Sequence, residues 1–181
     1  MHQHATSPTA LPAYKAGAAA LMLAISSLAT AYGFQYIGGY EPCALCLMER
    51  YAYYVGIPLL FLALVLVATE RAGWAAAIFF LVALAFLANA GLGTYHAGAE
   101  WKFWPGPDTC GGSQSLGGGS GGLLKELETI RVIRCDEAPW QFLGLSFAGW
   151  NVVASFLIFV AALQAAFAAS ARNTQRRMSE I

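Results

Sequence analysis

The sequence predicts an all-α membrane protein: an antiparallel bundle of four transmembrane helices with a short amphipathic surface helix in the second outer loop. Of its 181 residues 58% are hydrophobic and 11% are charged, whereas soluble domains contain about 25% charged residues. Four apolar segments approach the roughly 20 residues that cross a bilayer. The formal net charge is zero, so the chain has no excess of positive charge that would indicate a nucleic acid partner.

The first apolar segment, about 16–36, contains no charged residue and is long for a signal peptide, so we interpret it as a membrane helix. The other predicted spans are about 50–68, 74–95 and 147–169. Asn89 in the third span is expected to bond to a neighbouring helix. The predicted organisation is an N-terminal tail, a four-helix membrane domain and a basic C-terminal tail, at residues 1–15, 16–169 and 170–181.

Four spans place both termini and the polar turn at 69–73 on one side of the membrane. That side carries basic residues in short segments, namely Lys15, Arg71, Arg172, Arg176 and Arg177. The positive-inside rule therefore predicts cytoplasmic termini in a multi-pass membrane protein. The outer loops, about 37–49 and 97–146, then hold all the cysteines in the oxidising periplasm: Cys43, Cys46, Cys110 and Cys135.

The second outer loop combines two kinds of sequence. Residues 111–122 are rich in glycine and serine, so they are flexible by composition and let Cys110 move. Residues 123–133 place leucine and isoleucine on one helix face with charges opposite. This pattern predicts a short helix lying on membrane lipid, and packing against the other loop fits it equally well.

The Cys43-x-x-Cys46 pair precedes the second span. Pro42 suits the first turn of a helix, which would place Cys46 in the opening turns, where unpaired N–H groups and the helix dipole favour a thiolate. Arg50 follows one turn later on the same face and adds a positive charge. Because the thiolate is the form that attacks disulfides, the pattern predicts a redox pair.

Zinc binding and purely structural disulfides are the two alternative roles for the cysteines. A zinc site needs a second close pair of ligands, but Cys110 and Cys135 are separated by 24 residues and no histidine stands near either pair in the sequence. We therefore predict no metal. Purely structural disulfides suit the compartment, and for Cys110 and Cys135 a structural bridge is the default. A disulfide that closes a glycine-rich loop holds that loop less rigidly, however, and leaves its cysteines able to move and react.

Two disulfides at one membrane face suggest a relay by thiol–disulfide exchange, which needs a final electron acceptor. The chain lacks the glycine-rich strand–turn–helix fingerprint of a nucleotide cofactor. A quinone dissolved in the membrane remains. Arg50 is placed to bond a quinone carbonyl, although an interfacial arginine that extends into the headgroups is the alternative.

The four predicted spans and a cysteine pair in the long outer loop accompany the stretch Cys43-Ala44-Leu45-Cys46-Leu47-Met48-Glu49-Arg50. The segment from Cys135 to Ser146, followed by Trp150-Asn151, leads into the last span. Together these features resemble the DsbB family, the quinone-linked thiol oxidases of bacterial inner membranes. The resemblance covers about residues 16–169.

The resemblance implies an enzyme that reoxidises a DsbA-like periplasmic thioredoxin-fold protein and passes the electrons to the quinone pool, as ubiquinone or menaquinone. It implies that Cys110 is attacked by the reduced partner and that Cys135 pairs with Cys110 at rest. Cys43 would then accept the electrons. Cys46 would engage the quinone, with Arg50 as its electrostatic support.

His96, at the end of the third span, falls near where the family places a histidine beside the quinone, while a histidine bonded to interfacial water is the commoner case. Two rival functions remain. Vitamin K epoxide reductase-like proteins also combine four membrane helices, a CxxC pair and a quinone, but their pair is expected near a later helix. The other rival function is a non-catalytic membrane scaffold whose cysteines form structural disulfides in the outer loops.

Overall fold

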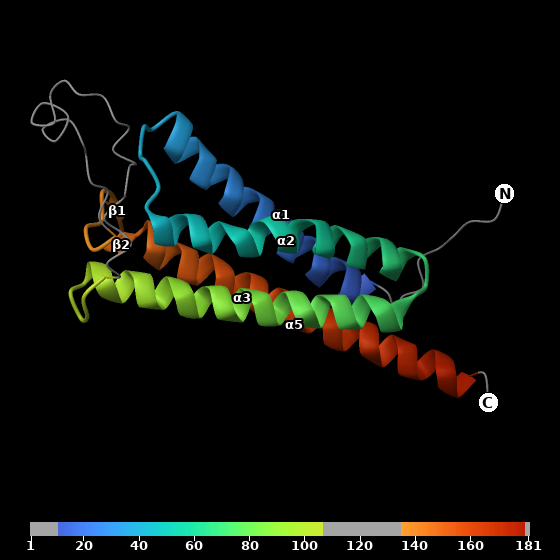
Figure 1. The fold of residues 1–181 in the computed structure, drawn as a ribbon. Helices are drawn as coiled ribbons and strands as arrows, with labels where there is room; N and C mark the ends of the chain where they lie inside the picture. Colours follow the sequence, from blue (N-terminus) through green and yellow to red (C-terminus); the bar gives the residue numbers. More distant parts are fainter. Residues whose placement is uncertain (1–10, 107–134, 180–181) are drawn as a thin grey trace, which may run out of the picture.

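The computed structural model describes residues 11–106 and 135–179, which form four long helices and one short hairpin (Figure 1). The helices are α1 (Leu11–Tyr36), α2 (Ala44–Ala68), α3 (Ala72–Glu100) and α5 (Phe147–Ser179). Each is long and apolar enough to cross a membrane, which confirms the four predicted spans. The predicted surface helix at 123–133 lies outside the described residues.

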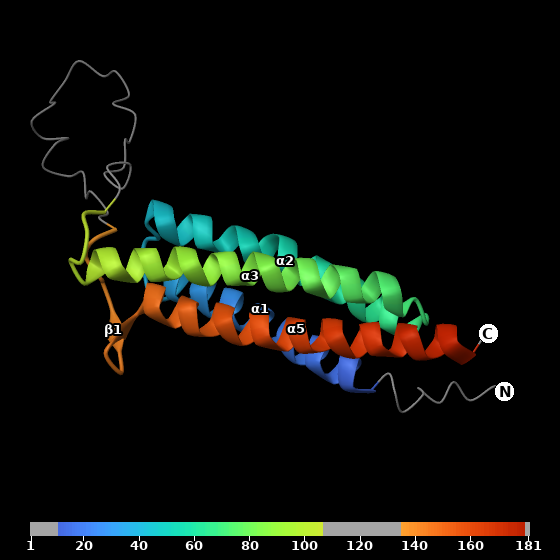
Figure 2. The same ribbon diagram turned by 90° about the horizontal axis from the view of Figure 1, so that it is seen from below.

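The helices form a closed ring in which each packs against two neighbours. α1 lies between α2 and α5, and α3 closes the ring on the opposite side. Figures 1 and 2 show the start of α1, the α2–α3 turn and the end of α5 at one end of the bundle. The start of α2, the end of α3 and the hairpin lie at the other end. The predicted antiparallel four-helix bundle is confirmed.

Several helices extend beyond the predicted spans. α2 begins at Ala44, α3 continues to Glu100, and α5 continues to Ser179 through most of the segment expected to form a basic tail. Hydropathy marks only the part of a helix inside the hydrocarbon, whereas local contacts decide where it ends. At the end of α5, Arg172 and Arg176 lie 3.5 and 3.7 Å from the carboxylate of Glu70 in the α2–α3 turn.

Buried polar contacts pin the helices together. The Asn89 amide on α3 donates to Ser155 Oγ on α5 at 2.9 Å, as the sequence predicted. The Tyr53 hydroxyl on α2 donates to Asn151 Oδ1 on α5 at 2.7 Å. These bonds fix the helices relative to one another close to the end that carries the cysteines.

Close packing in the bundle depends on glycine, and we expect Gly56→Ala to destabilise the protein by about 1–3 kcal/mol. A Cβ at Gly56 would lie 2.6 Å from Cε2 of Phe86, which is fully buried, so the ring or the helix must shift within the core. The midpoint of thermal unfolding in detergent measures the effect. Gly91→Ala on α3 is the matched control because nothing lies within 4 Å of its added Cβ. Equal melting temperatures for the two variants would contradict this packing.

A hairpin before α5, absent from the predicted all-helical fold, closes the cysteine end of the bundle. Its strands, β1 (Gln141–Phe142) and β2 (Leu145–Ser146), pair antiparallel around Leu143 and Gly144. Both turn residues have positive φ, 52° and 80°, as tight two-residue hairpin turns require. The hairpin delivers the buried Ser146 to the end of α3.

Candidate active site

The site begins at the N-terminus of α2. Cys43 is the N-cap, with extended backbone (φ −74°, ψ 172°), and its sulfur accepts the backbone N–H of Cys46 at 3.3 Å. A helix N-terminus favours negative charge. From the sequence alone, the stabilised thiolate is expected at Cys46. In the structure Cys43 occupies the capping position, because the helix begins two residues after Pro42.

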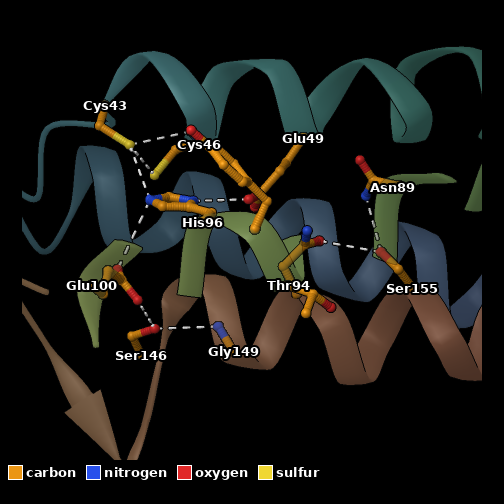
Figure 3. A network of polar contacts seen from close by, with 12 residues as sticks. Cys43, Cys46, Glu49, Asn89, Thr94, His96, Glu100, Ser146, Gly149 and Ser155 are labelled. Atoms are coloured by element: carbon orange, nitrogen blue, oxygen red, sulfur yellow. Dashed lines mark hydrogen bonds and ion pairs between the residues drawn. The ribbon is translucent and has the colours of Figure 1, made fainter. Parts of the chain in front are cut away.

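The two thiols of the pair are free and point toward each other (Figure 3). Their sulfurs lie 2.8 Å apart, within hydrogen-bond distance, so closing a disulfide of about 2.05 Å requires little movement. The hydrogen bond with Cys46 is the main reason that the pKa of Cys43 is lowered to about 4, with His96 adding to the effect and burial opposing it. Cys43 is therefore the thiolate of the reduced pair.

His96 on α3 lies beside this thiolate. It is 1% exposed, its Nε2 is 3.6 Å from Cys43 Sγ, and its Nδ1 is 2.8 Å from Glu49 Oε1 (Figure 3). The histidine is therefore buried between a sulfur and a carboxylate and is not an interfacial side chain bonded to water. The premise that no histidine stands near the cysteines holds along the sequence and is wrong in space.

The network continues toward the hairpin. Glu100 Oε1 lies 3.9 Å from His96 Nε2, and the Ser146 hydroxyl donates to Glu100 Oε2. Ser146 Oγ in turn accepts the backbone N–H of Gly149 at 3.2 Å. The chain of polar groups thus runs from the sulfurs to the loop that precedes α5.

Arg50 makes contacts that the sequence did not predict. It is 9% exposed, donates to Gln35 Oε1 at 2.5 Å, and its guanidinium carbon lies 5.1 Å from the centroid of the Tyr32 ring. Both partners belong to α1. These contacts direct Arg50 toward α1, and the group facing the sulfurs is His96.

The second outer loop reaches the same place. Cys135 is 2% exposed and is held in a disulfide, and it packs in one cluster with Cys43 and Leu45. Cys46 and Leu92 lie against this cluster. The structure thus brings a cysteine of the second loop next to the CxxC pair, while Cys110 lies outside the described residues.

Sequence reasoning missed Glu49, Glu100, Ser146 and Gln35. Glu49 and Glu100 carried a usable signal, since an ionisable side chain within or at the end of a membrane span is rare and marks a functional site. Ser146 and Gln35 carried none, because their roles follow from the hairpin and from the packing of α1.

We expect the Cys43 thiol to titrate near pH 4 in the reduced protein, far below the ordinary value of about 8.5. Because the pKa is lowered, the stability that the thiolate contributes is present above the ordinary value and is lost as the pH falls through about 4. Thiolate absorbance of a Cys110→Ala/Cys135→Ala variant measures the transition. Cys46→Ala should move the inflection upward, because it removes the hydrogen bond that lowers the pKa of Cys43, and a wild-type inflection above pH 8 would contradict the assignment.

The fold and the site together define a multi-pass membrane protein with a dithiol centre at one end of a four-helix bundle, backed by a buried histidine and two carboxylates. The sequence model of the family described as "Disulfide bond formation protein DsbB" matches residues 15–165, so the chain belongs to that family. It is a membrane protein of disulfide bond formation, with an oxidoreductase role.

Three curated relatives carry the name "Disulfide bond formation protein B". The protein of Albidiferax ferrireducens is 27% identical over 87% of each chain. That of Aromatoleum aromaticum is 34% identical over 71% of this chain and 77% of its own, and that of Acidovorax sp. is 29% identical over 77% and 78%. No solved structure matches this chain.

Proposed function

We propose that the protein is a quinone-dependent protein-disulfide oxidoreductase. It takes two electrons from a reduced periplasmic thioredoxin-fold protein of the DsbA type and delivers them to ubiquinone or menaquinone. The observation that carries this proposal is the packing of the disulfide-bonded Cys135 against Cys43, beside the free CxxC pair. Thiol–disulfide exchange needs such contact between the attacking and the attacked sulfur.

The first exchange takes place with the partner. A partner thiolate attacks the Cys110 sulfur of a Cys110–Cys135 disulfide, forming a mixed disulfide and releasing Cys135 as a thiolate. The partner's second thiol then attacks the mixed disulfide, so the partner leaves oxidised and both loop cysteines are reduced. Two electrons have moved from the partner to the loop.

The second exchange takes place within the protein. A loop thiolate attacks Cys43 of the oxidised Cys43–Cys46 pair and releases the Cys46 thiolate, and the other loop thiolate then restores the loop disulfide. Cys43 and Cys46 are left reduced. His96 is placed to stabilise the negative charge on Cys43 and to pass a proton, since it lies between that sulfur and Glu49.

A quinone supplies the acceptor for two electrons and two protons when it is bound. Arg50 fits such a group because it lies one turn after Cys46 and is largely buried at the bundle edge. Its guanidinium carries five N–H donors, and Gln35 accepts from one of its nitrogens. Arg50 would hold a quinone carbonyl, and Cys46, which is partly exposed, would face the ring.

The orientation proposed for the protein is cytoplasmic termini and periplasmic cysteines in the bacterial inner membrane. The basic residues of the α2–α3 turn and of the last turns of α5 gather at the end opposite the cysteines (Figure 2). Basic residues are retained on the cytoplasmic side. This orientation places the cysteines where disulfides persist.

Quinone reduction by the full-length protein in lipid nanodiscs tests the proposal. Addition of a reduced thioredoxin-fold partner should convert quinone to hydroquinone with a stoichiometry of one disulfide formed per quinone consumed. A non-catalytic scaffold would leave quinone unchanged. Failure of the wild-type protein with both ubiquinone and menaquinone would overturn the proposal.

We expect Arg50→Ala to raise the apparent KM for quinone about tenfold or more with a smaller change in kcat, because it removes a contact made to bound quinone. Steady-state rates at varied quinone concentration measure KM and kcat separately. Arg71→Ala, at the other end of the bundle, is the matched control and should leave both parameters unchanged. An unaltered KM in Arg50→Ala would remove Arg50 from the quinone site.

A further inference from the structure

The start of α2 and the end of α3 together present a set of metal ligands. Cys43, Cys46 and His96 each offer one ligand atom, and the three atoms lie within 4.8 Å of one another. We propose that the reduced cysteine pair and His96 bind a thiophilic divalent d10 cation, Zn²⁺ or Cd²⁺, which holds the centre in its dithiolate form. Soft thiolate ligands favour such ions.

The distances suit a tetrahedral ion. With Zn–S of about 2.3 Å and Zn–N of about 2.0 Å, neighbouring sulfur and nitrogen ligands lie about 3.5 Å apart. Cys43 Sγ and His96 Nε2 are 3.6 Å apart in the structure. Two sulfur ligands lie about 3.8 Å apart on the same geometry, whereas the sulfurs of the pair are now 2.8 Å apart. Cys46 must therefore turn outward by about 1 Å, which its partly exposed position permits.

The histidine is already oriented as a ligand. Its Nδ1 lies 2.8 Å from Glu49 Oε1, so Nδ1–H donates to the carboxylate, and Nε2, which faces Cys43, is the nitrogen that would bind the ion after releasing its proton (Figure 3). Histidines that ligate metals bind a carboxylate in this way through the other ring nitrogen. This second observation is independent of the sulfur positions.

Glu100 lies near the fourth coordination position of the proposed ion. Its Oε1 lies 3.9 Å from His96 Nε2, and its other oxygen is held by the Ser146 hydroxyl. We assign the fourth position to this carboxylate or to a water molecule that it binds. Structural zinc sites have four ligands, and sites with three protein ligands keep one place for water.

Binding would oppose turnover without transferring electrons. Cys43 is already a thiolate, so ion binding releases the proton of the Cys46 thiol and the proton on His96 Nε2. Forming the Cys43–Cys46 disulfide then requires both metal–sulfur bonds to break as two electrons leave. At a cation concentration 100 times Kd the reduced form is favoured 100-fold, which raises its reduction potential by about 59 mV. This consequence rests on the proposed function, whereas the binding itself does not.

Cadmium titration of the full-length protein in nanodiscs tests the proposal. A Cys110→Ala/Cys135→Ala background leaves the CxxC pair as the source of thiolates. After reduction by a phosphine, the protein should bind one equivalent of Cd²⁺ with a sulfur-to-cadmium absorbance band. The same protein in its disulfide form should bind none. Absence of the band in the reduced protein, or equal binding by both forms, would overturn the proposal.

Variants then assign the ligands. Cys43→Ser, Cys46→Ser and His96→Ala should each weaken binding at least about 100-fold, and Glu49→Gln should weaken it about 10- to 100-fold. Thr94→Val on α3 is the matched control, because its hydroxyl bonds only the backbone of its own helix among the described contacts. Undiminished binding by His96→Ala would overturn the site. A protein that binds Cd²⁺ but fails, metal-free, to reduce quinone would refute the proposed function and leave this inference standing.

Discussion

Cys46→Ser is expected to abolish electron transfer from a reduced thioredoxin-fold partner to quinone, with a loss of at least about 10³-fold in rate. In the structure Cys46 Sγ lies 2.8 Å from Cys43 Sγ. Without it, Cys43 has no sulfur with which to close the disulfide that carries electrons onward. Quinone absorbance during turnover measures the rate.

The matched control is Ala44→Ser, which places the same hydroxyl group on an exposed neighbour at the first residue of α2. It should retain the wild-type rate. In Cys46→Ser the protein should instead accumulate with Cys43 bonded to a loop cysteine, visible by mass spectrometry without reductant. Full activity of Cys46→Ser would exclude the pair from the electron path.

Cys110→Ser is expected to separate the two halves of the relay. Oxidation of the protein partner should fall at least about 10³-fold, because the sulfur that the partner attacks is missing. A small dithiol, which reaches Cys43 and Cys46 directly, should still reduce quinone at close to the wild-type rate. Both rates are measured by quinone absorbance on the same sample.

Ser115→Ala, in the glycine-rich stretch that follows Cys110, is the matched control and should leave both rates unchanged. Two outcomes would contradict the relay. In one, Cys110→Ser oxidises the partner normally. In the other, the small dithiol loses its route to the same extent as the protein partner, which would mean that the variant damages the CxxC centre itself.

The fold was largely predictable because hydropathy and length set the number of spans. The Asn89 bond to α5 was also predictable, since a polar group in hydrocarbon needs a partner on another helix. The hairpin was not, because it depends on positive φ at Leu143, a residue with no preference for that conformation. Helix ends were likewise set by local contacts such as those of Glu70 with α5.

The contact between the two cysteines was predictable from their spacing, whereas the position of His96 beside them was not predicted. His96 is distant in sequence, but Cys46 and His96 lie at nearly equal separations from the turn at Glu70, so an antiparallel α2–α3 pair brings them together. An antiparallel pairing of the second and third spans would have placed His96 beside the cysteines. The position of the thiolate was beyond the sequence, since a shift of a residue or two in the start of α2 exchanges the roles of Cys43 and Cys46.

Thiol trapping in a single turnover tests the central claim most directly. The oxidised protein is mixed with reduced partner in the absence of quinone, quenched with an alkylating reagent, and digested to locate the label. We predict that Cys43 and Cys46 become labelled, and that addition of quinone before the quench protects them again. Quinone consumption while Cys43 and Cys46 remain joined and unlabelled throughout would contradict the account.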